Sequence, residues 1–364
     1  MSKKIIIAGG GTGGHIFPAI AIANAIKKLE PSIEILFVGA KGKMEMEKVP
    51  QAGYEIKGLD IVGFNRSSLI KNIGLPFKVM KSFLQVRQIF NAFHPDAVIG
   101  VGGYSSFPVL KYAQARNIPS FIHESNSYAG KSNKLLGSKA KKIFVATEGM
   151  EKFFRSKNIM LSGNPVRKII SANTISREEG IHFFGLDPAK KTVLSIGGSL
   201  GAKSINEALD KNLGEFEKNG LQLIWQSGKP YAEKATESAA GKTNIWAGDF
   251  ITKMEYEYAA ADLVISRSGA MAIAELCVMK KPVVFVPFPY AAEDHQTVNA
   301  QSLVNKNAGI MIKDSEALNK LVPTIIALSK EEQRQNELKN NIAKLAVTNA
   351  DEIIAKEILT AIAK

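Results

Sequence analysis

An apolar run followed at once by a glycine-rich loop and a histidine opens the chain, and it constrains the fold more than any other feature. Residues 5–8 read Ile-Ile-Ile-Ala, and residues 9–15 read Gly-Gly-Gly-Thr-Gly-Gly-His. A strand, a glycine turn and a helix form an anion-binding arrangement, because backbone N–H groups can approach a diphosphate closely and the helix dipole adds positive charge. We expect the helix to open near Phe17-Pro18, with His15 beside the bound anion.

The same glycines also satisfy the G-x-G-x-x-G pattern of dinucleotide-binding oxidoreductases. Such enzymes need an acidic residue at the carboxyl end of the second strand, where it binds the ribose. The second expected strand, residues 35–38, ends in Gly39-Ala40-Lys41. Glu34 lies at its wrong end, and Glu45 and Glu47 fall in the next expected helix. The sequence therefore argues against a nicotinamide cofactor.

Length and composition indicate two globular domains. The chain has 364 residues, 45% of them hydrophobic, which suffices for two packed cores. It contains no uninterrupted apolar run long enough to span a membrane and no signal peptide, so we expect it in the cytoplasm. The single cysteine, Cys277, excludes an internal disulfide and is expected in the core.

The net charge of +13 predicts attraction to an anionic partner. Nucleic acid, a phosphorylated substrate and an acidic lipid surface all fit that charge. The sequence shows no zinc-finger spacing, no aromatic RNA-binding signature and no basic tail. We therefore expect a pyrophosphate ligand or lipid, and no nucleic acid.

The second half of the chain repeats the opening design. A buried strand at residues 192–196 is followed by Gly197-Gly198-Ser199-Leu200-Gly201 and a helix from about Lys203. Strands also alternate with helices in between, which predicts a parallel sheet in each half and a ligand cleft at the carboxyl ends of the strands. The turn formers at 162–165 mark a hinge. We predict domains 1–163 and 164–345, with a final helix in 346–364 that packs back on the first domain.

A further anion cradle is expected in the second domain. A strand at residues 263–267, a tight turn and a helix over 271–279 place Glu275 where it could accept hydrogen bonds from a ribose, although a solvated glutamate fits as well. Asp294-His295-Gln296 and Asn299 then form an expected polar loop. That loop could recognise sugar hydroxyls or be solvated.

Taken together, these motifs resemble the GT-B nucleotide-sugar glycosyltransferases, and within them the branch that adds N-acetylglucosamine to a lipid-linked muramoyl-pentapeptide in peptidoglycan synthesis. The resemblance covers nearly the whole chain. It implies an α/β fold of GT-B type, with two Rossmann-like domains whose parallel sheets face a central cleft. The motifs that carry it are residues 10–18, Gly102-Gly103-Tyr104-Ser105, His123-Glu124-Ser125-Asn126, Gly163-Asn164-Pro165-Val166-Arg167, residues 197–202 and residues 267–275.

The resemblance implies that UDP-N-acetylglucosamine binds mainly to the second domain. Arg167 could neutralise the leaving diphosphate, although it could also be a mere surface charge. Some relatives carry a glutamine pair where this chain has His295-Gln296, so the sugar contacts can differ. The implied donor-binding residues are Thr12, Gly13, Gly14, Asn126, Arg167, Ser199, the Ile251 backbone, Ala270, Met271, Ala272, Ile273, Ala274, Glu275 and Gln296.

The implied acceptor is undecaprenyl-diphosphate-N-acetylmuramoyl-pentapeptide, lipid I, bound near Gly102, Gly103 and Tyr104. Its 4-hydroxyl would displace UDP with inversion and needs a base. We assign that role to His15, with Glu124 as the alternative base or as its support. His15 could instead only shape the glycine loop. No cofactor and no metal site are expected, because the chain lacks an acidic D-x-D site and its histidines are not paired at ligand spacing.

A polyprenyl acceptor requires contact with the membrane, and residues 73–93 offer a helix for it. Val79, Phe83, Val86 and Phe90 form one stripe, suited to the core. A second stripe lies roughly opposite and predicts an apolar patch with a basic rim on the cytoplasmic face of an anionic membrane, as a peripheral protein. A helix buried on both sides is the alternative. The second stripe and its rim are Phe77, Met80, Leu84, Lys78, Lys81 and Arg87.

Two other functions remain open. A UDP-N-acetylglucosamine 2-epimerase of related architecture would act on the donor alone and would not need a lipid-facing stripe. A catalytically silent sugar-nucleotide binder would not need His15. Other cell-wall synthesis proteins are possible partners.

Overall fold

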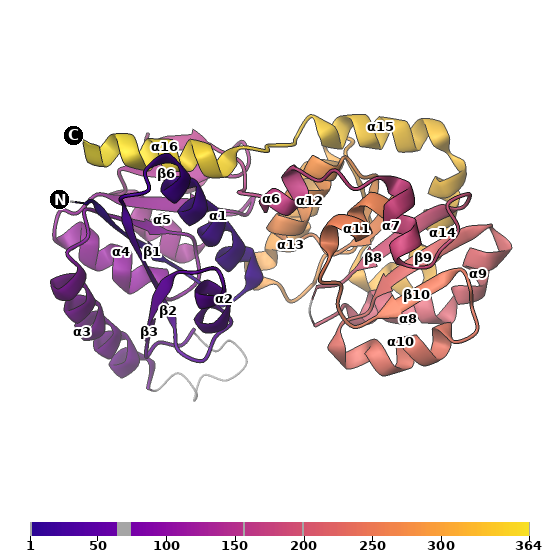
Figure 1. Cartoon of the computed structure of the whole chain (residues 1–364), viewed down its shortest axis with the longest axis horizontal. Helices are drawn as coiled ribbons and strands as arrows, with labels where there is room; N and C mark the ends of the chain where they lie inside the picture. Colours follow the sequence, from indigo (N-terminus) through magenta and orange to yellow (C-terminus); the bar gives the residue numbers. More distant parts are fainter. Residues whose placement is uncertain (1, 64–73, 156, 199, 364) are drawn as a thin grey trace. The chain divides into compact units, whose positions relative to one another are not determined.

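Two parallel sheets, each with its own hydrophobic core, organise the chain (Figure 1). The structure is a computed structural model and describes residues 2–63, 74–155, 157–198 and 200–363. The chain divides into two units: residues 1–167 with 347–364, and residues 168–346. The expected α/β class, with a parallel sheet in each half, is confirmed.

In the described part of the first unit, seven parallel strands form one sheet in the order β3-β2-β1-β4-β5-β6-β7. The interior strand β1 is buried on both faces, as a continuous Ile-Ile-Ile-Ala run predicts. Ile5 and Ile7 enter the core on one face, and Ile6 and Ala8 enter the core on the other. The strands are β1 (Lys4–Ala8), β2 (Glu34–Ala40), β3 (Glu55–Leu59), β4 (Ala97–Gly100), β5 (Ser120–Glu124), β6 (Lys142–Val145) and β7 (Ile159–Leu161).

Helices cover both faces of this sheet. Val86 of α3 joins the core on one face, and Ile22 of α1 joins the core on the other. The last helix, α16, packs along α1, where its Ile354 and Ile358 complete the second core. The C-terminal helix thus belongs to the first unit. The helices are α1 (Gly13–Leu29), α2 (Glu45–Gln51), α3 (Leu75–Phe93), α4 (Ser106–Ala115), α5 (Lys131–Gly137) and α16 (Ala350–Ala363).

The second unit repeats the plan. Over its described residues, six parallel strands run in the order β10-β9-β8-β11-β12-β13. The apolar run at residues 192–196 is confirmed as part of β8, which lies between β9 and β11. The strands are β8 (Lys191–Ile196), β9 (Leu221–Gln226), β10 (Ile245–Gly248), β11 (Leu263–Ser266), β12 (Val283–Phe285) and β13 (Ile310–Met311).

The helices of the second unit pack mainly through apolar stripes. Ile205 and Leu209 of α8 meet Leu321 and Ile325 of α14 in one core. The helices are α6 (Lys168–Ser171), α7 (Arg177–Phe183), α8 (Lys203–Lys211), α9 (Leu213–Lys218), α10 (Ala232–Ala239), α11 (Met254–Ala260), α12 (Ala270–Met279), α13 (His295–Val304), α14 (Ala317–Lys330) and α15 (Glu332–Ala343).

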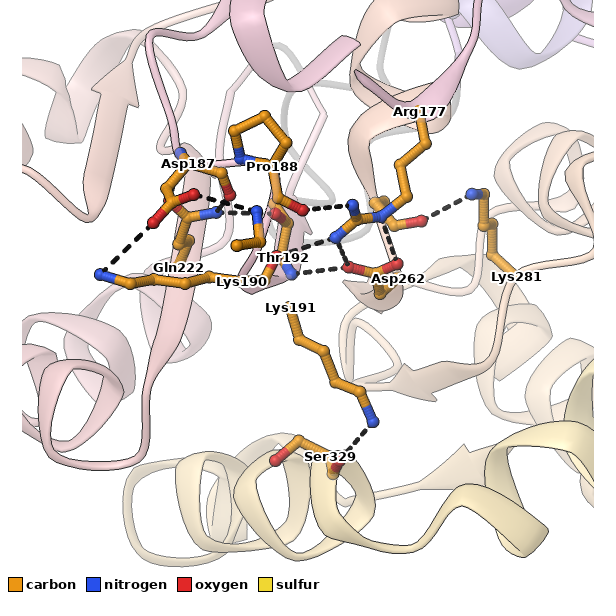
Figure 2. Close-up of polar contacts among 12 residues, drawn as sticks. Arg177, Asp187, Pro188, Lys190, Lys191, Thr192, Gln222, Asp262, Lys281 and Ser329 are labelled. Atoms are coloured by element: carbon orange, nitrogen blue, oxygen red, sulfur yellow. Dashed lines mark hydrogen bonds and ion pairs between the residues drawn. The ribbon is translucent and has the colours of Figure 1, made fainter. Parts of the chain in front are cut away.

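A polar cluster closes the amino edge of the second sheet (Figure 2). The Arg177 guanidinium donates two hydrogen bonds of 2.8 Å to the Asp262 carboxylate, which also accepts the Thr192 N–H at 2.8 Å. Arg177 further donates to the carbonyls of Pro188 and Lys190. Its hydrogen bond to Asp262 raises the pKa of the guanidinium. The cluster links α7 to the starts of β8 and β11. It leaves the opposite edge, at the carboxyl ends of the strands, to the loops of the candidate site.

Two element boundaries differ from the expectations in a way that affects the site. Helix α1 begins at Gly13, not near Phe17-Pro18, so His15 lies in its first turn. His295, Gln296 and Asn299 lie on α13 and not in a loop. His15 and Gln296 thus lie in the first turn of a helix, the end that carries the positive pole of the helix dipole.

Candidate functional site

The glycine loop of the first unit lies at the carboxyl end of β1, beside the loop that follows β4. Gly10 N–H donates to the Gly102 carbonyl at 3.3 Å. A Cβ on Gly103 would lie 2.4 Å from the Gly10 carbonyl oxygen, and Gly103 has φ +82°. Both facts require glycine there, because a side chain would clash with the backbone and strain it. The two glycine-rich motifs are thus one packed structure.

His15 lies against this double loop. Its Nδ1 is 3.0 Å from the Gly10 carbonyl oxygen and 3.4 Å from the Thr12 hydroxyl. Because a carbonyl only accepts, the bond to Gly10 places the proton on Nδ1 and leaves the lone pair on Nε2. A Cβ on Gly102 would lie 2.7 Å from Nε2, so Gly102 leaves room for the ring. The structure therefore brings together His15, Thr12 and the expected acceptor glycines.

Tyr104 lies on the same edge. Its ring atom Cε1 is 3.9 Å from the position that a Cβ on Gly11 would take. Burial raises the pKa of its hydroxyl, and the charge of Glu45 raises it further. Tyr104 is thus half-buried beside the glycine loop, with a neutral hydroxyl that can donate a hydrogen bond.

Glu124 ends β5, the strand next to β4, and its carboxylate is occupied by neighbouring donors. Oε1 accepts the Asn126 backbone N–H at 3.1 Å and the Asn126 side-chain amide at 3.4 Å. Oε2 accepts Gly130 N–H at 3.0 Å and the Asn133 amide at 2.8 Å. The carboxylate is also buried. In this arrangement Glu124 orients Asn126, so it fits the supporting role better than that of a base.

A buried histidine lies behind these loops. His123 donates from Nε2 to the Gly163 carbonyl at 3.3 Å, and its Nδ1 lies 3.5 Å from the Ser125 hydroxyl. Burial lowers its pKa to about 4. A Cβ on Gly163 would lie 2.7 Å from Val347 Cβ, so the segment leaving the first unit touches the returning segment at this glycine. The sequence analysis did not assign His123 a role.

Arg167 is the last residue of the first unit and is half-buried. Its guanidinium carbon lies 5.2 Å from the centre of the Phe17 ring on α1. The ring face attracts the cation and holds the side chain near the start of that helix. Arg167 is therefore not a freely solvated surface charge.

In the second unit, α12 begins at Ala270, directly after β11 and Ser268-Gly269. Residues 270–274 are half-buried in its first turns. Glu275 is only 5% exposed, and its Oε2 accepts the Tyr258 hydroxyl at 3.0 Å. The solvated-glutamate alternative is thus wrong. A buried carboxylate with one oxygen held by tyrosine is suited to fixed hydrogen bonding.

Gln296 is the second residue of α13, and hydrogen bonds connect it to the loops around it. Its side-chain carbonyl accepts Phe288 N–H at 3.0 Å, and its backbone carbonyl accepts the Ser268 hydroxyl at 2.8 Å. Asn299 donates to the Ser268 carbonyl at 3.2 Å. These bonds join the loop after β11 to the start of α13. They leave the Gln296 amide nitrogen as the group with which that side chain could contact a sugar.

The glycine loop after β8 is the other loop of this unit that was expected to bind an anion. A Cβ on Gly201 would lie 2.0 Å from the Ser227 carbonyl oxygen, and Gly201 has φ +71°. The loop therefore packs backbone against backbone on the loop after β9. Ser199 lies outside the described residues. Ile251 is buried, as a residue that contributes only its backbone to a site can be.

Sequence reasoning missed the side chain that ties the loops of the second unit together. Arg267 donates to the carbonyls of Val286 and Pro287 at 2.9 and 3.1 Å, and to the Ser204 hydroxyl at 3.2 Å. It also pairs with Asp314. One guanidinium thus joins the ends of β11, β12 and β13 to α8. The signal was an arginine directly after a buried strand, within a motif that the sequence analysis quoted without giving it a role.

Helix α3 of the first unit has one inward and one outward face. Val86 and Phe90 are buried, while Val79 and Phe83 are half-buried. Phe77, Met80 and Leu84 are 71%, 61% and 57% exposed. The alternative of a helix buried on both sides is therefore wrong within this chain.

The basic rim of that face is partly paired. Lys81 and Lys41 form ion pairs of 2.9 Å with Asp60 and lower its pKa to about 2. Lys78 and Arg87 are exposed. Among the helices that the structure describes, none is both long and apolar enough to cross a bilayer. The described residues also contain no group of three His, Cys, Asp or Glu side chains arranged to hold a metal ion.

Family models match both units. Residues 5–145 match the N-terminal domain of glycosyltransferase family 28, and residues 192–355 match its C-terminal domain. The chain belongs to glycosyltransferase family 28. A relative in Phocaeicola vulgatus is 52% identical, over 98% of this chain and 95% of its own length. It is named UDP-N-acetylglucosamine–N-acetylmuramyl-(pentapeptide) pyrophosphoryl-undecaprenol N-acetylglucosamine transferase.

Solved structures agree with this family 28 assignment. The crystal structure of Acinetobacter baumannii MurG matches with a TM-score of 0.77 and 29% identity, over 98% of this chain and 99% of that one. The expected GT-B fold is thereby confirmed. A putative UDP-N-acetylglucosamine 2-epimerase from Listeria monocytogenes matches with a TM-score of 0.71 at 15% identity, covering 100% and 96% of the two chains. At that identity the likeness concerns the fold alone.

Proposed function

We propose that the chain transfers N-acetylglucosamine from UDP-N-acetylglucosamine to the 4-hydroxyl of N-acetylmuramic acid in undecaprenyl-pyrophosphoryl-muramoyl-pentapeptide. The products are a β-1,4-linked disaccharide on the lipid, lipid II, and UDP. Relatives named for this transfer at about half identity over nearly the whole chain support the substrates. The arrangement of His15 between two glycine-rich loops carries the chemistry.

His15 is suited to act as the general base of the transfer. Its Nδ1–H is bonded to Gly10, so Nε2 is the atom that can accept the proton of the acceptor hydroxyl. The hydroxyl oxygen then forms the new bond to C1 of the sugar, the bond from C1 to the UDP phosphate breaks, and UDP leaves with the electron pair. Glu124 is less suited, because its two oxygens already accept four hydrogen bonds.

The acceptor sugar belongs on the first unit, near Gly102, Gly103 and Tyr104. Gly102 places no side chain against His15 Nε2, and the Tyr104 hydroxyl can donate a hydrogen bond. Thr12, Gly13 and Gly14 form the start of α1, where first-turn N–H groups favour an anion.

The nucleotide belongs mainly on the second unit. The N-terminus of α12, residues 270–274, can bind a phosphate, and Glu275 can accept hydrogen bonds from the two ribose hydroxyls. Gln296 is placed to contact the sugar through its amide nitrogen. The cationic groups that could stabilise departing UDP include Arg167, whose guanidinium is held over Phe17.

The protein acts at the cytoplasmic face of the membrane in this proposal, as a peripheral protein. Three exposed apolar side chains on one face of α3, bordered by Lys78, Lys81 and Arg87, support contact with anionic lipid. The lipid-linked acceptor would be reached from that surface.

Acceptor-dependent release of UDP tests the transfer. With a short-chain lipid I analogue, the protein should release UDP and form a disaccharide that mass analysis detects. His15→Ala should lower kcat at saturating substrates by at least ~10²-fold, the loss expected for a general base. His182→Ala is the matched control, because His182 is an exposed histidine on α7.

Two outcomes would contradict this function. Turnover of the donor without acceptor would indicate a 2-epimerase or a hydrolase, and tight donor binding without turnover would indicate a silent binder. If His15→Ala lowered kcat by much less than ~10²-fold, His15 would not be the general base, but the proposed transfer itself would stand.

A further inference from the structure

A buried carboxylate lies under the glycine loop of the first unit, and the proposed transfer does not use it. Glu45 is in the first turn of α2 and is 1% exposed. Its Oε1 accepts Ala40 N–H at 3.0 Å, at the end of β2. Its Oε2 accepts Gly11 N–H at 2.8 Å, within the glycine loop. The Glu45 carboxylate is removed from water, and its two hydrogen bonds to backbone N–H groups fix its position.

Glycines enclose this carboxylate closely. A Cβ on Gly10 would lie 2.3 Å from the Glu45 carboxylate carbon, and a Cβ on Gly39 would lie 2.5 Å from Glu45 Cγ. Gly10 also has φ +150°, which side chains rarely adopt. Gly10 of the phosphate-type loop and Gly39 of β2 are therefore required, at least in part, by the glutamate packed against them.

The carboxylate and His15 bond to opposite ends of the same peptide group. The Gly11 N–H and the Gly10 carbonyl belong to one planar amide. Glu45 accepts the N–H at 2.8 Å, and His15 Nδ1 donates to the carbonyl oxygen at 3.0 Å. Hydrogen bonds in such a chain polarise one another, so the carboxylate makes the Gly10 oxygen a stronger acceptor.

We propose that Glu45 is a positioning residue for His15, acting through the Gly10–Gly11 peptide. It fixes the peptide plane, holds the proton on Nδ1 and stabilises the imidazolium that forms when Nε2 takes up a proton. The role is that of the carboxylate that orients a catalytic histidine, with one amide inserted between the two groups. This proposal rests on the proposed function, because the basicity of His15 matters only if His15 is the general base of the transfer.

The charge of Glu45 acts across the loop. It contributes, after burial, to the raised pKa of Tyr104 on the other side of the glycines. His123 of β5 is a titratable group that interacts electrostatically with His15, and its pKa of about 4 keeps it neutral through the working range. Neither Tyr104 nor His123 changes its charge near neutral pH. A change at Glu45 should therefore appear in the titration of His15 itself.

Removal of that charge gives the first test. Glu45→Gln keeps the shape but loses the charge, and its amide NH₂ cannot accept the second N–H. The pKa of His15, measured by NMR on imidazole-labelled protein, should fall by about one unit, the size expected for an opposite charge beyond one peptide group. The acid limb of the kcat profile should move to lower pH by the same amount, with a plateau about tenfold lower.

Glu47→Gln is the matched control. Glu47 lies on the same helix but is exposed, and its carboxylate bonds only to Lys48 and Gln51 among the contacts of the structure. The change removes the same charge and should leave the pKa of His15 and the pH profile in place. If Glu45→Gln does not fold, Glu45→Asp replaces it. The shorter aspartate cannot reach both N–H groups, so it should lower the pKa of His15 by less than Glu45→Gln does.

A double variant separates action through His15 from damage to the loop. In His15→Ala, the change Glu45→Gln should lower kcat by less than about twofold further, because the group it acts on is gone. The proposal would be overturned if the kcat losses of the two single variants multiplied in the double variant. It would also be overturned if folded Glu45→Gln left the pKa and the tautomer of His15 unchanged. The NMR titration needs no turnover. It therefore still tests Glu45 if His15→Ala keeps its activity, the result that would refute His15 as the base.

Discussion

The Arg267 guanidinium and the Asp314 carboxylate form an ion pair with Nη1 and Oδ1 2.5 Å apart, at the carboxyl edge of the second sheet. Their side chains are only 12% and 24% exposed. Arg267 also bonds to two carbonyls after β12, and the Ser204 hydroxyl bonds to both charged groups. The pair therefore fixes the relative positions of several loops that would hold the nucleotide.

Loss of either charge should weaken both the fold of this unit and donor binding. Asp314→Ala leaves the Arg267 charge without its carboxylate, and we expect the free energy of unfolding to fall by about 3 kcal/mol. The dissociation constant for UDP should rise, because the loops lose their common anchor. Denaturant unfolding and calorimetric titration with UDP measure the two effects.

An exposed ion pair on α15 provides the control for that experiment. Glu337→Ala removes the ion pair with Arg334 and a hydrogen bond from Asn307, both at the surface, and should change the free energy of unfolding by less than about 1 kcal/mol. Equal effects of Asp314→Ala and Glu337→Ala would contradict an anchoring role for Asp314.

His123 should make the stability depend on pH below neutrality. Its pKa is about 4 in the folded protein and 6.5 when exposed, because burial disfavours the charged ring. The unfolded chain therefore takes up a proton first as the pH falls below 6.5, and stability is lost down to about pH 4. The full loss is roughly 3 kcal/mol for this group. His123→Gln should show a flatter curve over that window, measured by urea unfolding at several pH values.

The exposed His182 gives the comparison for this curve. His182→Gln should follow the wild-type pH dependence, since its ring is in water in both states. A wild-type slope that persists in His123→Gln would assign the acid sensitivity to other groups.

Glu275 should matter for donor binding more than for the rate of transfer. Glu275→Gln keeps the volume and one acceptor but loses the charge that would bind two ribose hydroxyls. We expect KM for UDP-N-acetylglucosamine to rise about tenfold or more, with a smaller change in kcat. A rise of this size corresponds to the loss of hydrogen bonds to a charged group, which contribute about 1.5–3 kcal/mol. UDP lacking the ribose hydroxyls should bind the wild type and Glu275→Gln equally.

Tyr258→Phe separates orientation of the carboxylate from its direct contact. This change removes the 3.0 Å hydrogen bond to Glu275 without touching the charge. Its effect on KM should lie between wild type and Glu275→Gln. A Glu275→Gln variant with an unchanged KM would exclude the ribose contact.

Local pattern was enough to predict several strands of each sheet, among them β1, β2, β8 and β11. Ile5-Ile6-Ile7-Ala8 is apolar on both faces, and the structure buries both faces. Strands β3, β7, β9, β10 and β13 were not predicted. In β3, Glu-Ile-Lys-Gly-Leu, only the last residue is fully buried and a glycine interrupts the pattern. Helix α1 begins at Gly13, earlier than expected. A later start was predicted because glycines such as Gly13 and Gly14 are poor helix formers and a proline such as Pro18 is typical of a first turn.

The supporting side chains of the site could not be predicted in this way. Glu45 was correctly placed on a helix, yet its bond to Gly11 joins residues 34 apart and depends on the pairing of β1 with β2. The bond from Arg267 to Asp314 spans 47 residues and depends on the order of β11, β12 and β13. Sequence spacing identifies glycine loops and a histidine, whereas strand order decides which distant charges hold them.

The outward face of α3 should bind lipid without contributing to stability. Phe77 and Leu84 are more than half exposed, so Phe77→Ser with Leu84→Ser should leave the free energy of unfolding within about 0.5 kcal/mol. The same change should reduce binding to vesicles containing anionic lipid, measured by flotation, because it removes the side chains that would enter the interface.

Charge and control variants make this prediction specific. Lys78→Glu should weaken binding to anionic vesicles mainly at low salt, since surface attraction is screened. The matched control is Leu135→Ser, which removes an equally exposed leucine from α5, at 71% exposure, and should leave binding nearly unchanged. Transfer to a short-chain, water-soluble acceptor should survive in Phe77→Ser with Leu84→Ser, because the catalytic loops are untouched. Undiminished vesicle binding in that folded double variant would show that the apolar face of α3 does not contact lipid.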